Sequence, residues 1–257
     1  MYILLGVGVN SMVIGLVPAK CINDNIDYNL SQLFKFLEMA SHDQIDYIFF
    51  GESFLQGFDS LSWSFEKDKT IALSQDSLII DSIKDKARHF GVGIGFGYFE
   101  LSKESIYSSY LVISPQGKVI TNYRRISKGW KEVSKTDHHY KEGKSIVQIE
   151  LESFKLTLAL CGDLWDEQSY PMFLHESVRN TRIIWPVYVD FSKVEWLKEL
   201  HVYHHQAMKF SNHVFLVNNI AEPNAHGGAF HFNKAEYETV EFDKEDILRV
   251  QLKTYNK

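Results

Sequence analysis

Strand-like and helix-like segments alternate along the chain, and this alternation constrains the fold more than any other feature of the sequence. Over residues 27–40, apolar side chains recur every three or four residues, which predicts an amphipathic helix. Short apolar runs such as 45–50 predict buried strands. The alternation indicates a layered α/β architecture, with two sheets stacked face to face and helices outside. The expected helices span Asp27–Ala40, Ser74–Phe90, Gln168–Asn180 and Val194–Asn212, and the expected strands span Met12–Val17, Ile45–Phe50, Gly93–Phe99, Tyr107–Ser114, Lys118–Tyr123, Ser145–Leu151, Lys155–Leu160, Arg182–Tyr188, Val214–Asn219 and Ile247–Leu252.

The bulk composition favours one globular domain over residues 1–257. Hydrophobic residues make up 45% of the chain, which is enough for one large core, and no linker, repeat or long charge block divides it. The formal net charge is −6, so we expect no nucleic-acid partner, because phosphate binding needs a concentrated basic face. Beyond the first nineteen residues, no run reaches the roughly 20 apolar residues of a membrane span, and we expect no membrane partner.

The first nineteen residues allow two interpretations. Met1–Ala19 is largely apolar and ends in small residues, as a secretory signal peptide does. Against that interpretation, the stretch contains no Lys or Arg, and Asn10 and Ser11 interrupt its apolar run. The same stretch fits two strands, Tyr2–Val9 and Met12–Val17, which we favour. We therefore expect a cytoplasmic protein, while a cleaved signal stays open.

The cysteine and histidine content argues against a disulfide scaffold and against a metal site. The chain has two cysteines, Cys21 and Cys161, which are too few for a disulfide scaffold in a chain of this length. They form no CxxC pair, and no HExxH motif appears among the 11 histidines. The adjacent pairs His138–His139 and His204–His205 do not share one helix face. We expect no bound metal.

Three segments place reactive side chains just after a predicted strand, where α/β folds collect their functional sites. In the first segment, Glu52 follows directly on the apolar strand 45–50. Its aromatic surroundings favour a general base. The alternative is a helix N-cap or a surface glutamate, and this segment alone does not separate the two interpretations.

In the second segment, Cys161 ends the predicted strand 155–160, and Gly162 follows it at a sharp turn. Glycine lets a backbone N–H approach a ligand closely, and a thiol beside such a donor has the arrangement of a nucleophile and its oxyanion hole. The alternative is a buried structural cysteine, which is the commoner fate of an isolated cysteine and our interpretation of Cys21.

The third segment, residues 122–132, is basic and aromatic and contains Arg124, Arg125, Lys128 and Lys131. Cations placed beside a thiol favour the thiolate and stabilise an oxyanion. The alternative is a solvated basic loop, which is the usual role of such a cluster.

Together the three segments resemble the nitrilase superfamily of carbon–nitrogen hydrolases. That family carries a Glu in a P-E-x-F-x-x-G-(F/Y) motif, a Lys in Y-R-K and a Cys in C-Y-D-x-R-F-P-E, in this order. The resemblance covers most of the chain, from about Met12 to Leu252, and the spacing between the motifs is similar. The matching residues are Glu52, Phe54, Gly57 and Phe58 in the first motif, where Gly51 replaces the usual Pro, and Cys161 and Asp163 in the third.

The resemblance implies a fold and an assembly. The family folds as a four-layer αββα sandwich and commonly dimerises, so we expect a homodimer or a larger homo-oligomer.

The middle motif departs from the family pattern, because Tyr123-Arg124-Arg125 has Arg where the family has its catalytic Lys. Lys128 or Lys131, further along the loop, would replace that Lys, or Arg125 would serve directly. An arginine stabilises an oxyanion but is not a proton donor. We favour Lys128, and the other two interpretations stay open.

The resemblance also implies roles for neighbouring residues. Many family members have a second Glu, between the Lys and Cys motifs, that orients the substrate; Glu132 is the nearest match here and Asp137 the next. The backbone N–H of Gly162 would hold the oxyanion together with the cation. Trp165 stands near the place of an Arg in the usual motif, which implies an altered substrate pocket.

The implied reaction is hydrolysis of a small amide, or less favourably of a nitrile. Glu52 would take the thiol proton of Cys161, the sulfur would attack the substrate carbon, and water would hydrolyse the resulting thioester. No cofactor is required.

One alternative is a catalytically impaired ligand-binding protein on the same fold, which the altered Lys motif favours. The other is an unrelated α/β protein with a structural Cys161.

Overall fold

Two six-stranded sheets form the centre of the molecule. The computed structural model describes residues 9–179, 181–221 and 223–255. In spatial order, the first sheet contains β14 (Leu248–Tyr255), β1 (Val9–Leu16), β2 (Tyr47–Phe49), β3 (Gly93–Ser102), β4 (Ser105–Ile113) and β5 (Val119–Arg124). The second contains β13 (Tyr237–Thr239), β12 (Ala229–Asn233), β9 (His213–Asn218), β8 (Arg182–Val187), β7 (Phe154–Leu158) and β6 (Val147–Leu151). The short strands β10 (Ile220–Ala221) and β11 (Ala225–His226) pair separately.

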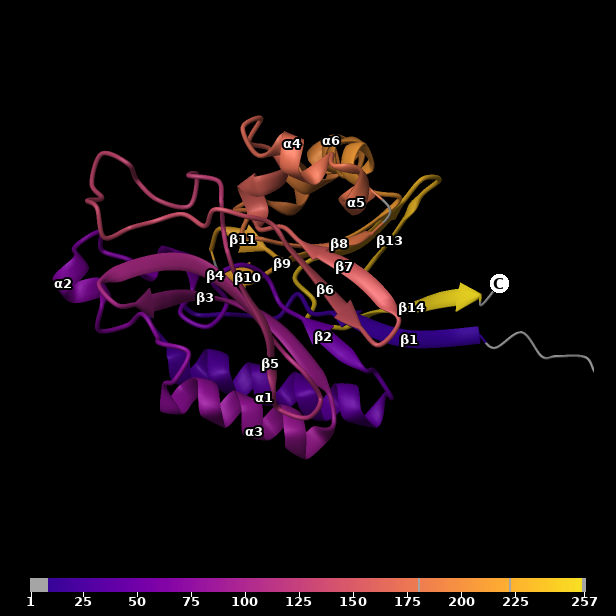
Figure 1. Cartoon of the computed structure of the whole chain (residues 1–257), viewed down its shortest axis with the longest axis horizontal. Helices are drawn as coiled ribbons and strands as arrows, with labels where there is room; N and C mark the ends of the chain where they lie inside the picture. Colours follow the sequence, from indigo (N-terminus) through magenta and orange to yellow (C-terminus); the bar gives the residue numbers. More distant parts are fainter. Residues whose placement is uncertain (1–8, 180, 222, 256–257) are drawn as a thin grey trace, which may run out of the picture.

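Helices cover the outer face of each sheet (Figure 1). On the first sheet lie α1 (Ile26–His42) and α3 (Leu78–Phe90), and on the second lie α4 (Tyr170–Phe173), α5 (Glu176–Arg179) and α6 (Lys193–Phe210). The short helix α2 (Phe65–Asp68) and the 3-10 turns η1 (Phe58–Ser60) and η2 (Cys161–Leu164) belong to connecting segments. The expected four-layer αββα order is confirmed.

Three apolar cores fill the three spaces between the four layers. One lies between α1, α3 and the first sheet and includes Phe36 and Ile83. The second lies between the two sheets and includes Phe49 and Leu156, and the third packs α6 against the second sheet around Trp196. The central strands β2, β8 and β9 are therefore covered on both faces, which explains their nearly continuous apolar sequences.

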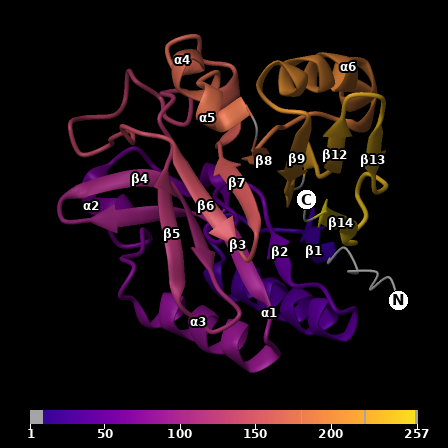
Figure 2. The ribbon, with the colours of Figure 1, turned by 45° about the vertical axis from the view of Figure 1, so that its right-hand side comes forward.

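Both sheets mix parallel and antiparallel strands. In the first sheet β1, β2 and β3 are parallel, and β4 and β5 follow as an antiparallel meander. In the second sheet β7, β8 and β9 are parallel. The edge strands β5 and β6 of the two sheets lie side by side (Figure 2). The ends of β2, β5 and β7 are thereby brought to one region of the molecule.

Local signals set the ends of the longer helices. At the start of α6, Ser192 and Glu195 form a reciprocal capping box, with Ser192 N donating to Glu195 Oε2 at 2.8 Å and Glu195 N to Ser192 Oγ at 3.3 Å. At the end of α3, Gly91 takes a left-handed conformation with φ of 68°, which glycine adopts without steric cost.

One expected helix is wrong. The segment Gln168–Asn180 forms two short helices, α4 and α5, and Asn180 itself lies outside the described residues. The break lies at His175, because Ser177 N donates to His175 Nδ1 and Val178 N donates to His175 O, so that a new helix begins. Several other boundaries shift by a few residues; for example, α3 begins at Leu78 after the N-cap Ser77, and β2 is shorter than 45–50.

The described part of the N-terminal stretch forms an inner strand. Residues 9–16 make β1, which pairs with β14 on one side and with β2 on the other. The expected strand Tyr2–Val9 lies outside the described residues except for Val9. None of the helices in the described ranges is long and apolar enough to cross a membrane.

Candidate active site

Three strand ends converge on one buried site. Glu52 follows β2, Arg125 follows β5 and Cys161 follows β7, so two side chains come from the first sheet and one from the second. Glu52 is 0% exposed and Arg125 is 3% exposed. Arg125 Nη1 donates to Glu52 Oε1 at 2.9 Å and to Oε2 at 3.1 Å. The site is therefore built on a buried ion pair.

Hydrogen bonds fix the backbone and the carboxylate of Glu52. Its backbone N donates to Val187 O, and its backbone O accepts from Asn219 Nδ2 at 2.8 Å. Ser108 Oγ donates to Glu52 Oε1 at 2.8 Å. Gly51 N donates to Asn219 Oδ1 at 3.0 Å, and a Cβ on Gly51 would collide with that same oxygen. This contact explains why Gly51 stands where the family motif usually has Pro.

The guanidinium of Arg125 spans the space between Glu52 and the turn that carries Cys161. Arg125 Nε donates to Ser127 Oγ at 2.8 Å. Its Nη2 lies so close to Gly162 that a Cβ there would collide with it. Since an arginine stays protonated in proteins, Arg125 places a permanent positive charge beside the turn that carries Cys161.

Cys161 sits at the first position of η2 in an unusual backbone conformation. Its φ is 39°, a left-handed value that side chains other than glycine rarely adopt. Its Sγ donates weakly to Tyr188 O at 3.6 Å, and its backbone O accepts from Trp185 Nε1 at 2.8 Å. Local strain of this kind clusters at functional sites.

The surroundings of Cys161 favour the protonated thiol over the thiolate. Burial raises its pKa to about 12; the charge of Arg125 opposes this rise and the charge of Glu52 adds to it. A resting thiol is compatible with catalysis only when a base removes its proton during attack. The charge of Glu52 is one of the influences on the pKa of Cys161, so its carboxylate lies close enough to the thiol to be a candidate for that base.

Asp163 ties the loop that carries Arg125 to the turn that carries Cys161. Its carboxylate is 0% exposed and accepts from Ser127 N and Leu160 N, both at 2.8 Å. Tyr123 Oη donates to the same carboxylate at 2.5 Å. Because these donors come from both sides of the site, Asp163 is a positioning residue.

A pocket of about 370 Å³ opens beside Arg125 and Gly162. Lys128 is exposed and lines this pocket together with the half-buried Trp165. The Trp165 ring packs edge-on against Tyr203, with centroids 5.1 Å apart. The structure therefore places Lys128 and Trp165 around the pocket, whereas Arg125 contacts Glu52 directly.

The remaining predicted residues lie on the loop after the Arg125 segment and do not contact Glu52. Lys131 pairs with Glu142 at 2.6 Å and donates to Tyr140 O at 2.6 Å. Glu132 is exposed and pairs with Lys135 at 2.8 Å. Asp137 is exposed as well. In this structure neither acidic residue reaches the ion pair.

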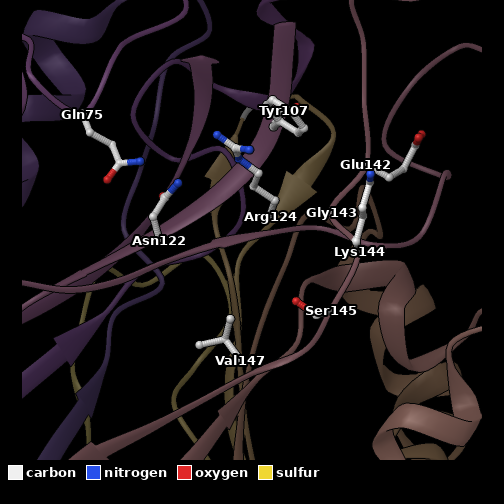
Figure 3. A pocket seen from close by; sticks show the side chains of 9 residues that line it. All are labelled: Gln75, Tyr107, Asn122, Arg124, Glu142, Gly143, Lys144, Ser145 and Val147. Atoms are coloured by element: carbon white, nitrogen blue, oxygen red, sulfur yellow. The ribbon is translucent and has the colours of Figure 1, made fainter. Parts of the chain in front are cut away.

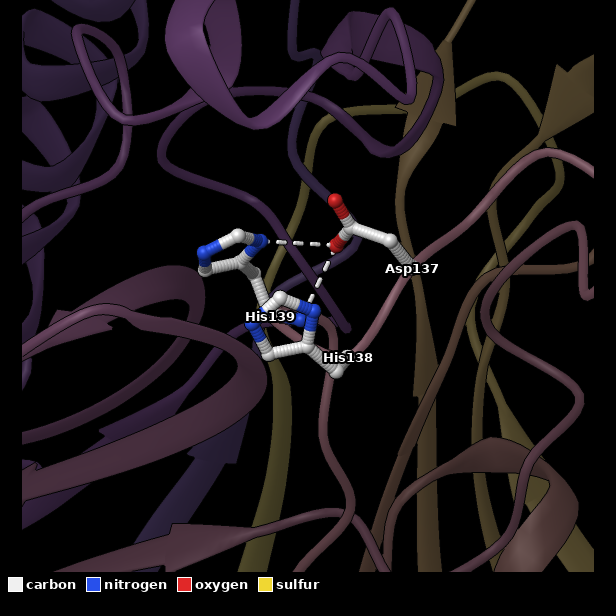
Figure 4. Close-up of side chains that lie close together, drawn as sticks. All are labelled: Asp137, His138 and His139. Atoms are coloured by element: carbon white, nitrogen blue, oxygen red, sulfur yellow. Dashed lines mark hydrogen bonds and ion pairs between the residues drawn. The ribbon is translucent and has the colours of Figure 1, made fainter.

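One cluster in the described residues has the composition of a metal site. The ligand atoms of Asp137, His138 and His139 lie within 4.8 Å of one another (Figure 4). Asp137 Oδ1 accepts from both the backbone N and the Nδ1 of His139, each at 2.9 Å. The His139 ring stacks on Phe65 with centroids 3.9 Å apart. These contacts account for the arrangement as a hydrogen-bonded turn, and we assign no ion to it.

Four residues of the site were given no role from the sequence. Ser108 and Asn219 hold Glu52, Ser127 holds Arg125, and the backbone O of Tyr188 accepts from the thiol. Ser108 and Tyr188 stood in expected strands and Asn219 at the end of one, but which strand end would face Glu52 depends on the stacking of the two sheets.

Comparison with known protein families identifies the family of this chain. The family model for carbon–nitrogen hydrolases matches residues 14–237. The chain belongs to the carbon–nitrogen hydrolase family. None of the curated protein sequences is significantly similar to the chain.

Solved structures share the fold at low sequence identity. A glutamine-dependent NAD+ synthetase from Acinetobacter baumannii matches with a TM-score of 0.78 and 15% identity over 94% of this chain. This chain spans only 45% of that synthetase chain. A nitrilase-superfamily amidase from Nesterenkonia matches with a TM-score of 0.73 and 12% identity, over 95% of this chain and 90% of that one. A superfamily protein from Xanthomonas campestris matches with a TM-score of 0.73 and 15% identity, over 95% and 91%.

Proposed function

We propose that this carbon–nitrogen hydrolase cleaves a small amide, with Cys161 as the nucleophile, Glu52 as the general base and Arg125 as the cation that holds the oxyanion. The observation that carries the proposal is the buried Glu52–Arg125 ion pair next to the Cys161 turn. A nucleophile, a base and a fixed positive charge are the three groups that acyl transfer through a covalent intermediate requires.

The proposed reaction begins with the protonated thiol. Glu52 takes the Sγ proton as the sulfur attacks the carbonyl carbon, and the carbonyl oxygen becomes an oxyanion beside Arg125 and the Gly162 backbone N–H. Collapse of this intermediate breaks the C–N bond, and Glu52 returns its proton to the leaving amine. Glu52 then deprotonates a water that attacks the thioester, which releases the acid and restores the thiol.

Arg125 is favoured over Lys128 and Lys131 as the cation of this site. It is the cation that bonds to Glu52, whereas Lys131 is paired with Glu142 and Lys128 is exposed at the pocket. Since arginine does not release a proton at neutral pH, every proton transfer in the reaction falls to Glu52. Lys128 instead contributes positive charge to the pocket that would receive the substrate.

The solved relatives suggest the substrate class and the probe. One of the matched structures is a Nesterenkonia amidase mutant that shows covalent addition of the acetamide moiety of fluoroacetamide at its active-site cysteine. The Acinetobacter baumannii synthetase is glutamine-dependent, and glutamine also carries a side-chain amide. A small primary amide is therefore the first class to test.

Intact-protein mass spectrometry with fluoroacetamide, together with an ammonia-release screen of small amides, tests the proposal. We expect one acetamide adduct at Cys161 and turnover of at least one amide. Cys161→Ala and Glu52→Gln should each lower the rate by about 100-fold or more, the scale of losing a general base or a nucleophile. Cys21→Ala is the matched control and should keep the rate. Full activity in Cys161→Ala would contradict the proposed mechanism.

A second candidate is a ligand-binding protein without turnover, and the substitution of Arg125 for the family Lys favours it. It shares the same pocket but needs no proton transfer at Glu52. Under this alternative, amides bind with equal affinity to the native chain and to Glu52→Gln, and neither ammonia release nor a Cys161 adduct appears.

A further inference from the structure

The adjacent arginines Arg124 and Arg125 serve opposite faces of one strand end. Successive side chains of a strand point to opposite faces of its sheet, so only one of the two enters the candidate active site. Arg124 instead pairs with Glu100 of β3, with Nη2 2.7 Å from Oε1 and Nε 2.8 Å from Oε2. Ser109 Oγ donates to Glu100 at 2.7 Å, just as the preceding residue, Ser108, donates to Glu52. The chain therefore builds a second Arg–Glu–Ser cluster beside the first.

The carboxylate of Glu100 is saturated with donors. It is 1% exposed, and besides Arg124 and Ser109 it accepts from Asn122 Nδ2 at 2.8 Å and Gln75 Nε2 at 3.2 Å. Burial raises the pKa of Glu100, but the hydrogen bonds from Arg124 and Ser109 lower it below its ordinary value. Because neutral donors also stabilise this carboxylate, Glu100 does not depend on Arg124 alone.

The guanidinium of Arg124 is also fixed in orientation. Its plane lies over the Tyr107 ring, with Cζ 3.9 Å from the ring centroid. Since Nε and Nη2 face Glu100, the planar group directs Nη1 away from that carboxylate. The side chain of Arg124 is 32% exposed, so this orientation is achieved at an accessible position. Little conformational entropy remains to be lost when a ligand binds.

Arg124 lines a pocket of about 520 Å³ (Figure 3). In Figure 3 the guanidinium lies beside the Tyr107 ring, and the carboxylate of Glu142 points away from it. Glu142 is paired with Lys131 at 2.6 Å, so its charge is already neutralised. The lining residues are Gln75, Tyr107, Asn122, Arg124, Glu142, Gly143, Lys144, Ser145 and Val147.

Further cations surround this pocket. Lys144 is exposed and lines it. Lys103 and Lys141 line an adjoining pocket of about 420 Å³, which shares Arg124 and Tyr107 and contains one acidic residue, Glu104. This local excess of positive charge lies in a chain whose net charge is −6. A cleft with an excess of one sign of charge concentrates ligands of the opposite sign.

We propose that the Arg124 pocket is a second ligand site, separate from the Cys161 site, that binds a small molecule through an oxyanion group, either phosphate or carboxylate. Arg124 Nη1 and Lys144 contact the oxyanion. Glu100 and Tyr107 are positioning residues that orient the guanidinium without touching the ligand. Both phosphate and carboxylate match the planar donors of arginine, and the choice between them is left to the probes.

Isothermal titration calorimetry at low ionic strength tests this site with pyrophosphate, inorganic phosphate and succinate as separate probes. We expect saturable binding of at least one probe with a Kd of about 1 mM or tighter. Lys144→Glu should weaken it by about tenfold or more, the scale of losing one charged hydrogen bond. The double variant Glu100→Gln/Arg124→Gln removes both charges of the pair together and should abolish binding without leaving a buried charge unpaired.

Two controls separate this site from general charge effects and from the candidate active site. Lys155→Glu, on the exposed face of β7, and Lys128→Glu, in the pocket beside Arg125, should both keep the affinity. Preference for pyrophosphate or phosphate assigns a phosphate ligand, and preference for succinate a carboxylate ligand. Failure of all three probes to saturate overturns the proposal. So does binding that Lys144→Glu leaves unchanged, or that Lys155→Glu weakens equally.

Discussion

At the scale of single residues, the candidate site is built on one buried ion pair. Glu52 and Arg125 are both almost inaccessible to water, and removing two charges from water costs several kcal/mol for each ion. The direct contact between them and the hydrogen bonds with Ser108 and Ser127 offset part of that cost. Loss of one partner leaves the other charge buried and unpaired, so stability and activity are coupled at this pair.

Arg125→Met should destabilise the fold by about 3–5 kcal/mol, because it leaves the Glu52 carboxylate unpaired. Arg125→Lys restores a cation and should recover most of that stability, which urea unfolding would measure. Lys128→Ala, the matched control, should change stability by less than about 0.5 kcal/mol, since Lys128 is exposed. If ammonia release fell as far in Lys128→Ala as in Arg125→Met, Lys128 would be the better assignment for the catalytic cation.

The two thiols should make the fold less stable at alkaline pH. Burial raises the pKa of both Cys161 and Cys21 from 9.0 to about 12 in the folded chain. Between these pH values the unfolded chain holds fewer protons than the folded chain, so stability falls as the pH rises. This contribution is fully present below pH 9.0 and is lost toward pH 12.

Urea unfolding between about pH 8 and pH 11 would measure this effect, by comparing the native chain with Cys161→Ser and Cys21→Ala. Each variant should reduce the downward slope by at most about 1.4 kcal/mol per pH unit, the limit for one proton. The buried tyrosines titrate equally in all three proteins and cancel in the comparison. Identical slopes would mean that the thiols titrate at ordinary values when folded.

The sequence singled out the residues that converge at the candidate site, but it did not indicate the residues that hold them in place. Glu52 and Cys161 followed from strand ends and motif order, because such positions are local properties of the chain. Arg125 was one of three candidate cations, and only its contact with Glu52 favours it over Lys128. The roles of Ser108 and Asn219 could not be predicted from the sequence, because each forms a hydrogen bond with Glu52 across 56 and 167 residues of chain, respectively.

At the scale of elements, the turn after β7 organises the site. Its first residue, Cys161, has a left-handed φ, its second, Gly162, leaves room for Arg125, and its third, Asp163, anchors the neighbouring loop. The sequence predicted a sharp turn at Gly162. It did not predict the break at His175, because the side-chain hydrogen bond that starts α5 leaves no periodic signal.

Gly162→Ala should displace Arg125 from Glu52, because the added Cβ would collide with Arg125 Nη2. We expect a loss of about 1–3 kcal/mol, the usual cost of overpacking, and a large fall in amide hydrolysis. Gly91→Ala is the control: its φ of 68° makes alanine cost about 1 kcal/mol, yet open space surrounds it and activity should persist. Unchanged activity in Gly162→Ala would show that Arg125 does not need its observed position.

At the scale of the whole molecule, the candidate site assembles only when both sheets are in place. Glu52 and Arg125 come from the first sheet, and Cys161 and Asn219 come from the second. The αββα layering was predictable from alternating strand and helix patterns and from the family resemblance. The relative placement of β5 and β6 was not, because edge strands of different sheets share no local sequence signal.

The homo-oligomer stays a prediction, and the outer helical layer offers a candidate surface for its interface. On α6, Val194 and Leu197 are 61% and 70% exposed, and they lie three residues apart on one face. An exposed apolar strip on a surface helix is a common feature of subunit interfaces.

We therefore expect Val194→Asp/Leu197→Asp to convert an oligomer into monomers, measured by size-exclusion chromatography with light scattering. Leu78→Asp is the matched control, because Leu78 is 86% exposed on α3 in the opposite layer. An unchanged mass in the double variant would place the interface elsewhere, and a monomeric native chain would contradict the expectation itself.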